Sequence, residues 1–317
     1  MDVVYFIVQQ TMFFMVPLLI VALGGMFSER SGIVNIALEG IMTMGAFTSI
    51  LFLNLTGKFM SGQMQLLIAI LIALATGGIF SLFHAYASIN MKADQTISGT
   101  ALNMFAPAFA IFVARVIQNV QQVQFVNTFR IESVPILGSI PIIGPLFFQN
   151  TYITTYIGFL ILIISYIVLF KTRFGLRLRA CGEHPHAADA AGVNVSIMQY
   201  AGVFISGALA GLGGLVFVVP TSTNFNATVS GYGFLAIAVL IFGQWNPIKI
   251  LGAAIFFGLT KAIASAYSGI PFLVSLNIPS YLYKMIPYIA TLLVLIFTSK
   301  KSSAPRASGV PFDKGQR

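Results

Sequence analysis

Long apolar runs separated by short polar segments make up most of this chain. A run of about 20 apolar residues is long enough to cross a membrane as a helix. We interpret eight runs of this kind as spans, at residues 3–27, 33–55, 65–90, 97–117, 151–170, 200–220, 250–267 and 281–298. A further run, Tyr232–Gly243, is too short for a full helical crossing and is interpreted as a half-helix or as part of a broken span.

The longest polar interruption, residues 171–199, indicates how the chain is oriented. Its first part is rich in cations that directly follow an apolar span, namely Lys171, Arg173, Arg177 and Arg179. Cations beside the end of a span mark the cytoplasmic side of a membrane. The basic tail after Thr298 falls on the same side if Tyr232–Gly243 is a real crossing, and the N-terminus then lies outside the cytoplasm.

The predicted fold is all-α, a polytopic membrane helix bundle of about 8–10 transmembrane helices with a broken helix and a cytoplasmic coupling helix. Residues 1–298 form the transmembrane domain, with 171–199 as its coupling loop. Residues 299–317 are expected to be a disordered, basic cytoplasmic tail. The segment Gln118–Asn150, rich in Gln, Asn and Pro, is expected to be a surface loop with small interfacial helices on the opposite side.

Composition supports a protein surrounded by membrane lipid. Hydrophobic residues make up 57% of the 317 residues, charged residues 8%, and the mean hydropathy is +0.91. Soluble domains carry about 25% charged residues. The net charge of +9 does not indicate nucleic-acid binding, because the cations are scattered through loops and the tail and form no basic face. The single cysteine, Cys181, excludes an intrachain disulfide.

Glu39 is the most informative polar residue inside a predicted span. An ionisable side chain at this depth is costly and usually faces the bundle interior or a pathway. Asn35 lies four residues earlier, which places it on the same face of a continuous helix. The flanking Gly32, Gly40 and Gly45 indicate that the helix is broken here. Asn35 and Glu39 are therefore pathway candidates, and three roles stay open for Glu39: a structural clamp, a substrate contact or a proton relay.

Two other spans contain informative polar or small residues. Ser98, Thr100 and Asn103 lie near the start of the fourth span and are candidates for lining a translocation pathway. For Asn103 an interhelical hydrogen bond is an equally good interpretation. Gly207 and Gly211 have the small-xxx-small spacing that lets two helices approach closely, so they are expected to pack against a neighbouring helix.

The coupling loop contains a short alanine-rich segment, 185–191, with the signals of a helix. Pro185 suits the first helical position, and Gly192 suits the left-handed residue that ends a helix. The alanines leave one side of this helix low enough for another protein to approach closely; they are Ala187, Ala188 and Ala191. A small helix beneath a membrane domain is a feature that a separate motor protein can grip, which suggests a transporter driven from the cytoplasm.

Neither a cofactor site nor a catalytic site is indicated. His184 and His186 are two residues apart and so do not share a helix face, and no zinc-binding HExxH spacing is present. The chain contains no phosphate-binding GxxxxGK[ST] loop and no evident nucleophile–base pair. We therefore expect a protein that binds no metal or cofactor and is not itself an enzyme.

Five sequence strings, taken together and in order, resemble a known family. They are SERSGIVNIALEG (28–40), DQTISGTALN (94–103), RFGLRLRACGEHPHAADAAGVNV (173–195), ISGALAGLGG (205–214) and IFGQWNPIKILGAA (241–254). They closely resemble the inner-membrane permease subunits of bacterial ABC importers in the branched-chain amino acid/ribose/nucleoside group. The match is best to the nucleoside and simple-sugar branch, and it extends over almost the whole chain.

The resemblance implies a multi-pass protein of the bacterial inner membrane that carries a nucleoside or a related simple sugar. It also implies three partners: a homologous second permease, an ABC ATPase that uses the ATP, and an extracytoplasmic substrate-binding lipoprotein. The family's coupling segment corresponds here to Gly182, Glu183, Pro185, Ala187, Ala188, Ala191 and Gly192, with His184 where an Asn is common. The alternative is an ion- or proton-coupled secondary transporter that uses Glu39, although such a transporter normally has several intramembrane acids.

Overall fold

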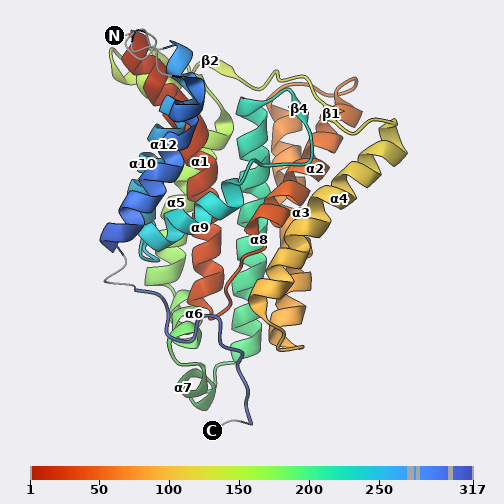
Figure 1. Cartoon of the computed structure of the whole chain (residues 1–317), viewed down its shortest axis with the longest axis vertical. Coiled ribbons are helices and arrows are strands. Elements are labelled where there is room, and N and C mark those ends of the chain that lie inside the picture. Colours follow the sequence, from red (N-terminus) through yellow and green to blue (C-terminus); the bar gives the residue numbers. More distant parts are fainter. Residues whose placement is uncertain (1, 270–274, 276–278, 299–302, 316–317) are drawn as a thin grey trace.

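The computed structural model of the chain is a bundle of long helices (Figure 1). It describes residues 2–269, 275, 279–298 and 303–315. The long helices are α1 (Asp2–Arg30), α2 (Leu38–Thr56), α3 (Gln63–Ile89), α4 (Gln95–Gln118), α5 (Ile153–Lys171), α8 (Val195–Thr221), α10 (Pro247–Ala266) and α12 (Ser280–Thr298). Within the described residues, seven helices are long and apolar enough to cross a membrane, so the predicted all-α polytopic fold is confirmed.

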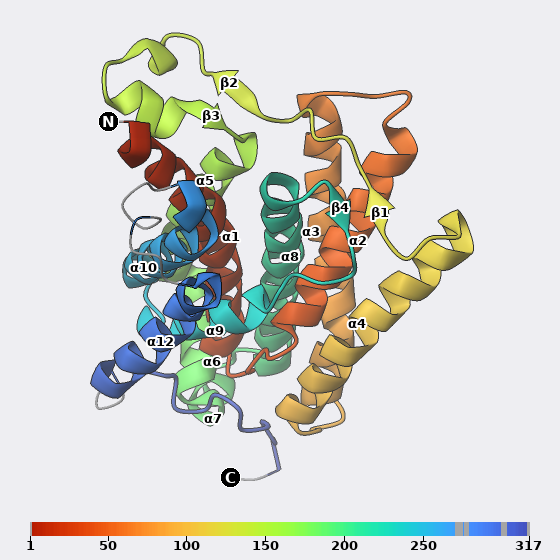
Figure 2. The same cartoon turned by 45° about the horizontal axis from the view of Figure 1, so that its top comes forward.

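The two ends of the bundle differ in structure. One end, called here the β end, holds four short strands, β1 (Val123–Gln124), β2 (Ile131–Ser133), β3 (Gln149–Thr151) and β4 (Asn224–Phe225), with the short helical turns η1 (Leu137–Ser139) and η2 (Gly144–Phe148). Strand β1 pairs with β4 and β2 with β3, both antiparallel. The other end, called the α7 end, holds α6 (Arg173–Glu183) and α7 (Pro185–Ala190) (Figure 2).

Helix α8 lies at the centre of the bundle, between α1, α2 and α3 (Figure 2). Glycines set the close approach of these helices. A side chain at Gly211 would overlap the backbone of α3 at Ala73 and Gly77, and a side chain at Gly207 would overlap Ser81. The packing role predicted for this pair of glycines is therefore confirmed. Close backbone contact suits a membrane protein, in which helix association depends on van der Waals packing more than on a hydrophobic driving force.

Helix α9 (Tyr232–Phe242) completes a crossing together with the extended chain before it. The extended chain starts at β4, which pairs with β1 at the β end. Just after α9, the Trp245 indole N–H donates to a carboxylate oxygen of Glu29, near the last residue of α1, at 2.6 Å. The route from one end to the other shows that this segment crosses the bundle as a broken span and does not turn back.

The observed boundaries follow the predicted spans except at four places. Helix α8 begins at Val195 and not near residue 200, so its first turn lies within the predicted coupling loop. Helix α2 begins at Leu38 and not near residue 33, because residues 31–37 form a non-helical junction. Helix α6, within the predicted coupling loop, was not foreseen; it is amphipathic and carries three of the four cations, Arg173, Arg177 and Arg179. The strands of the 118–150 loop were also missed, since two or three residues are too few to show an alternating pattern.

The C-terminal tail was expected to be disordered, and its described part, 303–315, is not. It lies along the α7 end (Figure 1). The Gly309 N–H donates to the Gly32 carbonyl at 3.0 Å, and the Ala307 N–H donates to the Gly182 carbonyl at 2.9 Å. Phe312 packs against the cluster formed by Cys181, Ala188 and Val195. The tail's small and apolar residues, which a count of its cations overlooks, make these contacts possible.

Two ion pairs add to the contacts of the tail. Asp313 pairs with Lys92 at 2.9 Å, and Lys314 pairs with Asp189 of α7 at 3.2 Å. The hydrogen bond from the Lys92 ammonium lowers the pKa of Asp313 below its ordinary value. Both pairs are exposed to solvent, so each stabilises the tail only slightly.

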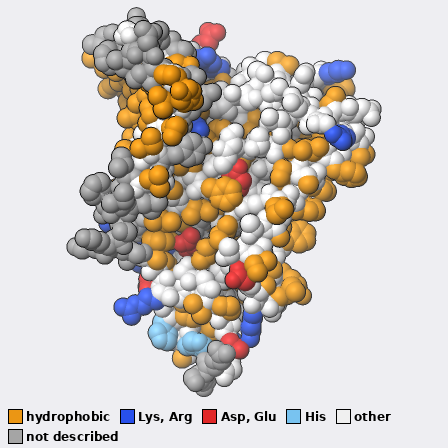
Figure 3. All heavy atoms as spheres, viewed as in Figure 1, with side chains coloured by type: hydrophobic (Ala, Val, Ile, Leu, Met, Phe, Trp, Pro, Cys, Tyr) orange, Lys and Arg blue, Asp and Glu red, His pale blue; other side chains and the backbone are white. Residues whose placement is uncertain are grey.

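Hydrophobic side chains cover much of the middle of the molecular surface seen in Figure 3, as expected of a surface that meets lipid or another membrane subunit.

Candidate functional site

The junction between α1 and α2, residues 31–37, is a break in the helical bundle. Two residues after the end of α1, the Gly32 backbone takes the left-handed conformation at φ +100°. The Ser28 hydroxyl donates to the Ile33 carbonyl at 2.7 Å and so closes the end of the helix. The backbone groups that follow have no helical partners, and inside a membrane domain such groups must be satisfied by the protein itself.

Side chains from α3 and α4 satisfy the first part of the break. The Val34 N–H donates to the Gln95 side-chain oxygen at 2.7 Å. The Val34 carbonyl is 3.0 Å from His84 Nε2, and His84 Nδ1 is 3.0 Å from the Ser98 hydroxyl. Because a carbonyl can only accept, a neutral imidazole carries its proton on Nε2, and Nδ1 accepts from Ser98. His84 is therefore a bundle residue with both nitrogens bonded.

Two asparagines satisfy the rest of the break. The Asn103 side chain donates to the Ile36 carbonyl at 2.9 Å and accepts from the Gly40 N–H at 2.7 Å. The Asn35 side chain donates to the Ser206 hydroxyl of α8 at 2.9 Å and accepts from the Ala37 N–H at 3.1 Å. Both amides therefore use their donor and their acceptor to hold the break in place.

Glu39 lies in the first turn of α2 and holds the start of α9. Its two carboxylate oxygens accept from the N–H groups of Gly231, at 2.8 Å, and Gly233, at 2.6 Å. The N-terminus of a helix exposes unpaired N–H groups and favours negative charge. Glu39 thus acts as a cap supplied by one broken helix to another, and this geometry favours the structural clamp among its three possible roles.

The predicted relation between Asn35 and Glu39 was wrong. Asn35 precedes the start of α2, so the two residues do not share a helix face. The glycines expected to break the helix also have another role. A side chain at Gly40 would overlap the backbone of α4 at Leu102, and one at Gly45 would overlap Gly211 of α8. They permit close packing of α2, while the break itself lies before Glu39.

The five predicted pathway residues are thus placed in two ways. Asn35, Glu39, Ser98 and Asn103 meet around the break and are bonded to it or to its partners. Thr100 lies on the exposed side of α4, and its hydroxyl bonds only to Thr96 of its own helix. Sequence reasoning missed Gln95 and Ser206, whose side chains complete the network. A polar residue in the first turn of a span is the signal that could have found Gln95.

Arg30 and Glu29 connect the coupling segment to α9. Arg30 pairs with Glu183 at 3.5 Å and also donates to the Trp245 carbonyl at 3.1 Å. Glu29 accepts from the Trp245 indole. Glu29 and Arg30 are adjacent and oppositely charged, but each contacts a distant segment. The α1 terminus therefore touches both the coupling segment and the residue that follows α9.

Helix α7 forms where the sequence predicts the coupling helix, and its caps are as expected. Pro185 occupies the first turn, and His184 Nδ1 accepts from the Ala187 N–H at 3.2 Å. Gly192 adopts the left-handed conformation at φ +80°. A side chain at Gly182 would overlap the Arg30 backbone, which places the start of the segment against α1.

The alanines of the coupling segment do not all face outward. Ala187 and Ala191 are exposed. Ala188 is only 5% exposed and packs with Cys181 and Val195, so the expectation that it forms part of the low outer side was wrong. Burial raises the pKa of the Cys181 thiol to about 11. Only one side of α7 is thus available to a partner.

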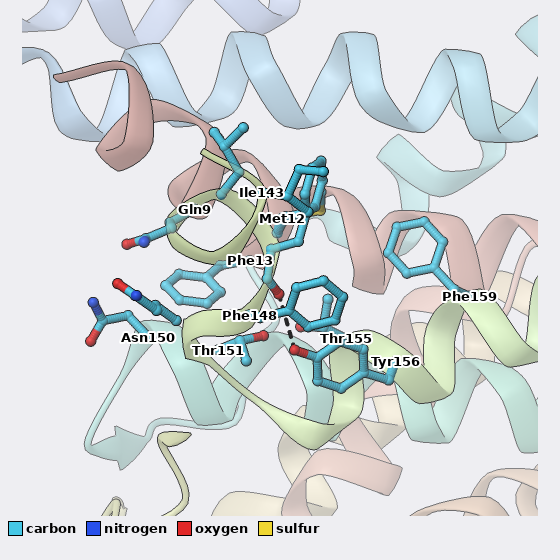
Figure 4. A pocket seen from close by; sticks show the side chains of 13 residues that line it. Gln9, Met12, Phe13, Ile143, Phe148, Asn150, Thr151, Thr155, Tyr156 and Phe159 are labelled. Atoms are coloured by element: carbon cyan, nitrogen blue, oxygen red, sulfur yellow. Dashed lines mark hydrogen bonds between the residues drawn. The ribbon is translucent and has the colours of Figure 1, made fainter. Parts of the chain in front are cut away.

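Two of the cavities beside the bundle have aromatic rings in their walls. One, of about 380 Å³, lies at the β end among α1, α5 and the 143–151 segment, and its wall combines aromatic rings with amide and hydroxyl side chains (Figure 4). The Tyr156 hydroxyl at its edge donates to the Phe147 carbonyl at 3.0 Å. The other, of about 480 Å³, lies beside the clamped start of α9, with Tyr232, Phe234 and Lys261 in its wall. Both volumes fall within the range of small-molecule pockets, roughly 300–1,000 Å³.

Comparison with known proteins identifies the family. The model of the family described as "Branched-chain amino acid transport system / permease component" matches residues 7–295. The chain belongs to this family. It is therefore a multi-pass membrane protein and a transport subunit. The resemblance found from the five sequence strings is confirmed. No solved structure matches the chain.

Three relatives illustrate how the chain is placed among the permeases. It is 45% identical to the guanosine ABC transporter permease protein NupQ of Bacillus subtilis, over 98% of this chain and 97% of that protein. It is 42% identical to the nucleoside ABC transporter permease protein NupC of Lactococcus lactis, again over 98% and 97% of the two chains. The putative glucose ABC transporter permease protein TsgC13 of Haloferax volcanii is 30% identical over 78% of this chain and 73% of that protein.

Proposed function

We propose that this chain is a transmembrane permease subunit of an ABC importer and that it moves nucleosides inward across the bacterial inner membrane. The observation that carries the proposal is the similarity, over nearly the whole length, to permeases named for guanosine and for nucleosides. A simple sugar is the second substrate class, because a permease named for glucose is also similar, at lower identity.

The second permease would be a distant relative of this chain. Two Lactococcus lactis proteins named as nucleoside ABC transporter permeases match it, NupC at 42% identity and NupB at 23%. The same holds in Bacillus subtilis for NupQ at 45% and NupP at 25%. We infer that two permeases of different sequence form one pathway and that this chain supplies the NupC/NupQ-type half.

The ATPase would dock on the α7 end. The exposed side of α7, with Ala187 and Ala191, offers a low surface for close approach. Force on α7 would reach the membrane domain by way of Glu183 and Arg30, and from there Trp245, which follows α9. ATP binding and hydrolysis belong to this partner, and the chain itself needs no cofactor. Gly182, Pro185, Ala188 and Gly192 would shape the segment without touching the ATPase.

The substrate-binding lipoprotein would dock at the β end, the opposite end from α7. The 119–152 segment and β4 form a folded surface there, held by the two strand pairs. A docked protein needs a fixed surface on which to release its cargo, and this pairing supplies it.

For the membrane interior we propose that Asn35, Glu39, Ser98 and Asn103 shape the pathway by fixing the break, without holding the substrate. Their hydrogen-bonding groups are already used within the bundle. Thr100 stays a candidate for direct contact, because the exposed side of α4 is available to meet the second permease.

Uptake by the complete importer tests the proposal. The chain, its second permease, the ATPase and the lipoprotein are reconstituted in vesicles, and uptake of radiolabelled guanosine is followed with and without ATP. We expect ATP-dependent uptake that unlabelled nucleosides inhibit and leucine does not. Uptake that ignores ATP and collapses with a protonophore would instead favour the ion-coupled transporter that uses Glu39.

A further inference from the structure

The extended segment between β4 and α9 has two chemically different sides. Its side chains alternate between exposed and buried. The exposed ones, called here the polar row, are Asn224, Asn226, Thr228 and Ser230. The buried ones are Phe225, Ala227 and Val229. An alternation of this kind means that one side of an extended chain packs on the bundle while the other faces outward.

The polar row runs from the β end to the middle of the bundle. At its upper end, Asn224 is part of β4, which pairs with β1. At its lower end, Ser230 precedes Gly231, which Glu39 holds at the start of α9. Figures 1 and 2 show this segment descending over the face of the bundle to α9. In Figure 3 the same region is mostly white, the colour of the backbone and of side chains that are neither hydrophobic nor charged, and an acidic side chain is visible at its lower end.

A cavity lies at each end of the row. The upper one, of about 530 Å³, includes Asn224 together with Asn54 and Gln124. The lower one, of about 480 Å³, includes Ser230, and its wall adds aromatic rings, Lys261 and a hydroxyl of α12, at Thr291. The row therefore connects a cavity at the β end to a cavity beside the α9 clamp.

Exposure of this segment to lipid would be unfavourable. Irregular backbone at membrane depth is tolerated only where protein covers it or where it lines a water-filled cavity. The row contains amides and hydroxyls and no charged side chain. Such groups match the hydroxyls of a sugar ring, and the exposed Phe234 ring below them suits a flat heterocycle.

We propose that the polar row is the wall along which the substrate, a neutral and hydroxyl-rich solute, descends from the β end to the cavity beside Tyr232. This proposal rests on the proposed function and adds the residues that meet the cargo. Asn226 and Thr228 are the central contacts. The Asn224 side chain is already bonded to Gln122, whereas the Asn226 amide has no partner among the described residues. Thr228 accepts from the Ser230 N–H and keeps its hydroxyl proton to donate.

Cysteine labelling tests the wall directly. Single cysteines are placed at 226 and 228, with cysteines at the buried positions 227 and 229 as matched controls. The native Cys181 gives little background because it is buried and its thiol pKa is raised to about 11. A membrane-impermeant thiol reagent is added to the reconstituted importer from the β side. We expect labelling at 226 and 228 but not at the controls, and we expect guanosine to slow that labelling.

Uptake measurements supply the second arm. Asn226→Ala and Thr228→Val are expected to lower the initial rate of guanosine uptake about tenfold, while the chain still assembles with its partners. Ser61→Ala, which removes an exposed hydroxyl from the loop between α2 and α3, is the control and is expected to leave uptake unchanged. Normal uptake in both row variants would overturn the proposal.

The remaining outcomes separate this proposal from the proposed function. If the cysteines at 226 and 228 do not react with the reagent, the row is covered by a partner or by lipid. This result would overturn the proposal that the row lines the substrate path, whatever the substrate is. Labelling that no transported solute slows would overturn it as well. If the importer carries a simple sugar and that sugar slows labelling, the nucleoside assignment fails and the wall stands. Transport of a charged amino acid would overturn both.

Discussion

The break between α1 and α2 and the coupling helix α7 are both short interruptions in the bundle, but they are held in opposite ways. Partners far away in the sequence hold the break, from α3, α4 and α8, and Glu39 reaches across to α9. Helix α7 satisfies its own backbone through His184 and Gly192 and rests on one buried alanine and a few surface contacts.

The difference follows from the surroundings of each segment. Inside a membrane no water satisfies a free backbone group, so a break there needs fixed polar partners. At the membrane surface water is available, so a small helix can be held by modest contacts and remain easy to move. A transporter that is driven from one end benefits from both features, a rigid membrane core and a coupling helix that can move.

Removing the Glu39 clamp is expected to have the largest effect. Glu39→Ala deletes both acceptors for the start of α9, and a hydrogen bond to a charged group contributes about 1.5–3 kcal/mol. We expect a loss of about 3 kcal/mol or more in the free energy of unfolding and little assembled importer, measured by thermal denaturation in detergent and by uptake. Glu39→Gln keeps one acceptor, so its free energy of unfolding should lie between those of the wild-type protein and the Glu39→Ala variant.

Glu132→Ala is the matched control for Glu39, since it removes an exposed carboxylate at the β end. Its effect is expected to stay within about 0.5 kcal/mol. Equal stability of the Glu39→Ala and Glu132→Ala variants would mean that the break does not depend on its clamp.

The second largest effect is expected at Asn103. Asn103→Ala leaves the Gly40 N–H and the Ile36 carbonyl without partners, and each unsatisfied buried group costs about 1–3 kcal/mol. Thr100→Ala, on the exposed side of the same helix, removes only a bond to its own helix. The melting temperatures of the two variants in detergent should therefore differ by several degrees. An equal fall in melting temperature would contradict the role of Asn103 in holding the break.

The coupling helix tests the other side of the comparison. Ala187→Arg adds a large side chain on the exposed side of α7, and we expect a folded chain that no longer co-purifies with the ATPase. Ala188→Arg forces an arginine among Cys181 and Val195 and should instead displace α7, which makes Cys181 accessible to thiol reagents. If the Ala187→Arg variant binds the ATPase as the wild-type protein does, α7 is not the docking site.

The smallest effect on stability is expected for Glu183→Gln. Glu183 is about half exposed and pairs with Arg30 at 3.5 Å, and exposed ion pairs contribute about 0–1 kcal/mol. We therefore expect an unchanged melting temperature but fewer molecules transported per ATP hydrolysed. A normal ratio would show that force passes from α7 to α1 by another route.

Much of the fold could be predicted from the sequence, because the length and composition of each apolar run indicate a helix that crosses a membrane. The spans, the crossing that includes α9, and the caps of α7 depend on local patterns that a reader of the chain can see. The glycines of α8 were also interpretable, since small residues at a helical spacing have few other uses.

The contacts of the site were harder to predict because they are not local. Gly231 lies far from Glu39 in the sequence, and nothing near Glu39 indicates that α9 is its partner. The direction of the Ala188 side chain depends on how α7 packs against α6. The polar row was overlooked because alternation over a few residues is a weak signal within a helical membrane protein.

The position of the C-terminal tail has a practical consequence for anyone who prepares this protein. The described residues 303–315 lie on the same surface as α7 and touch Asp189 and Cys181's cluster. An affinity tag or fluorescent protein fused after Arg317 would therefore sit beside the surface where we expect the ATPase to bind. Helix α1 begins at the other end of the bundle (Figure 1), so an N-terminal fusion would stay away from the ATPase surface.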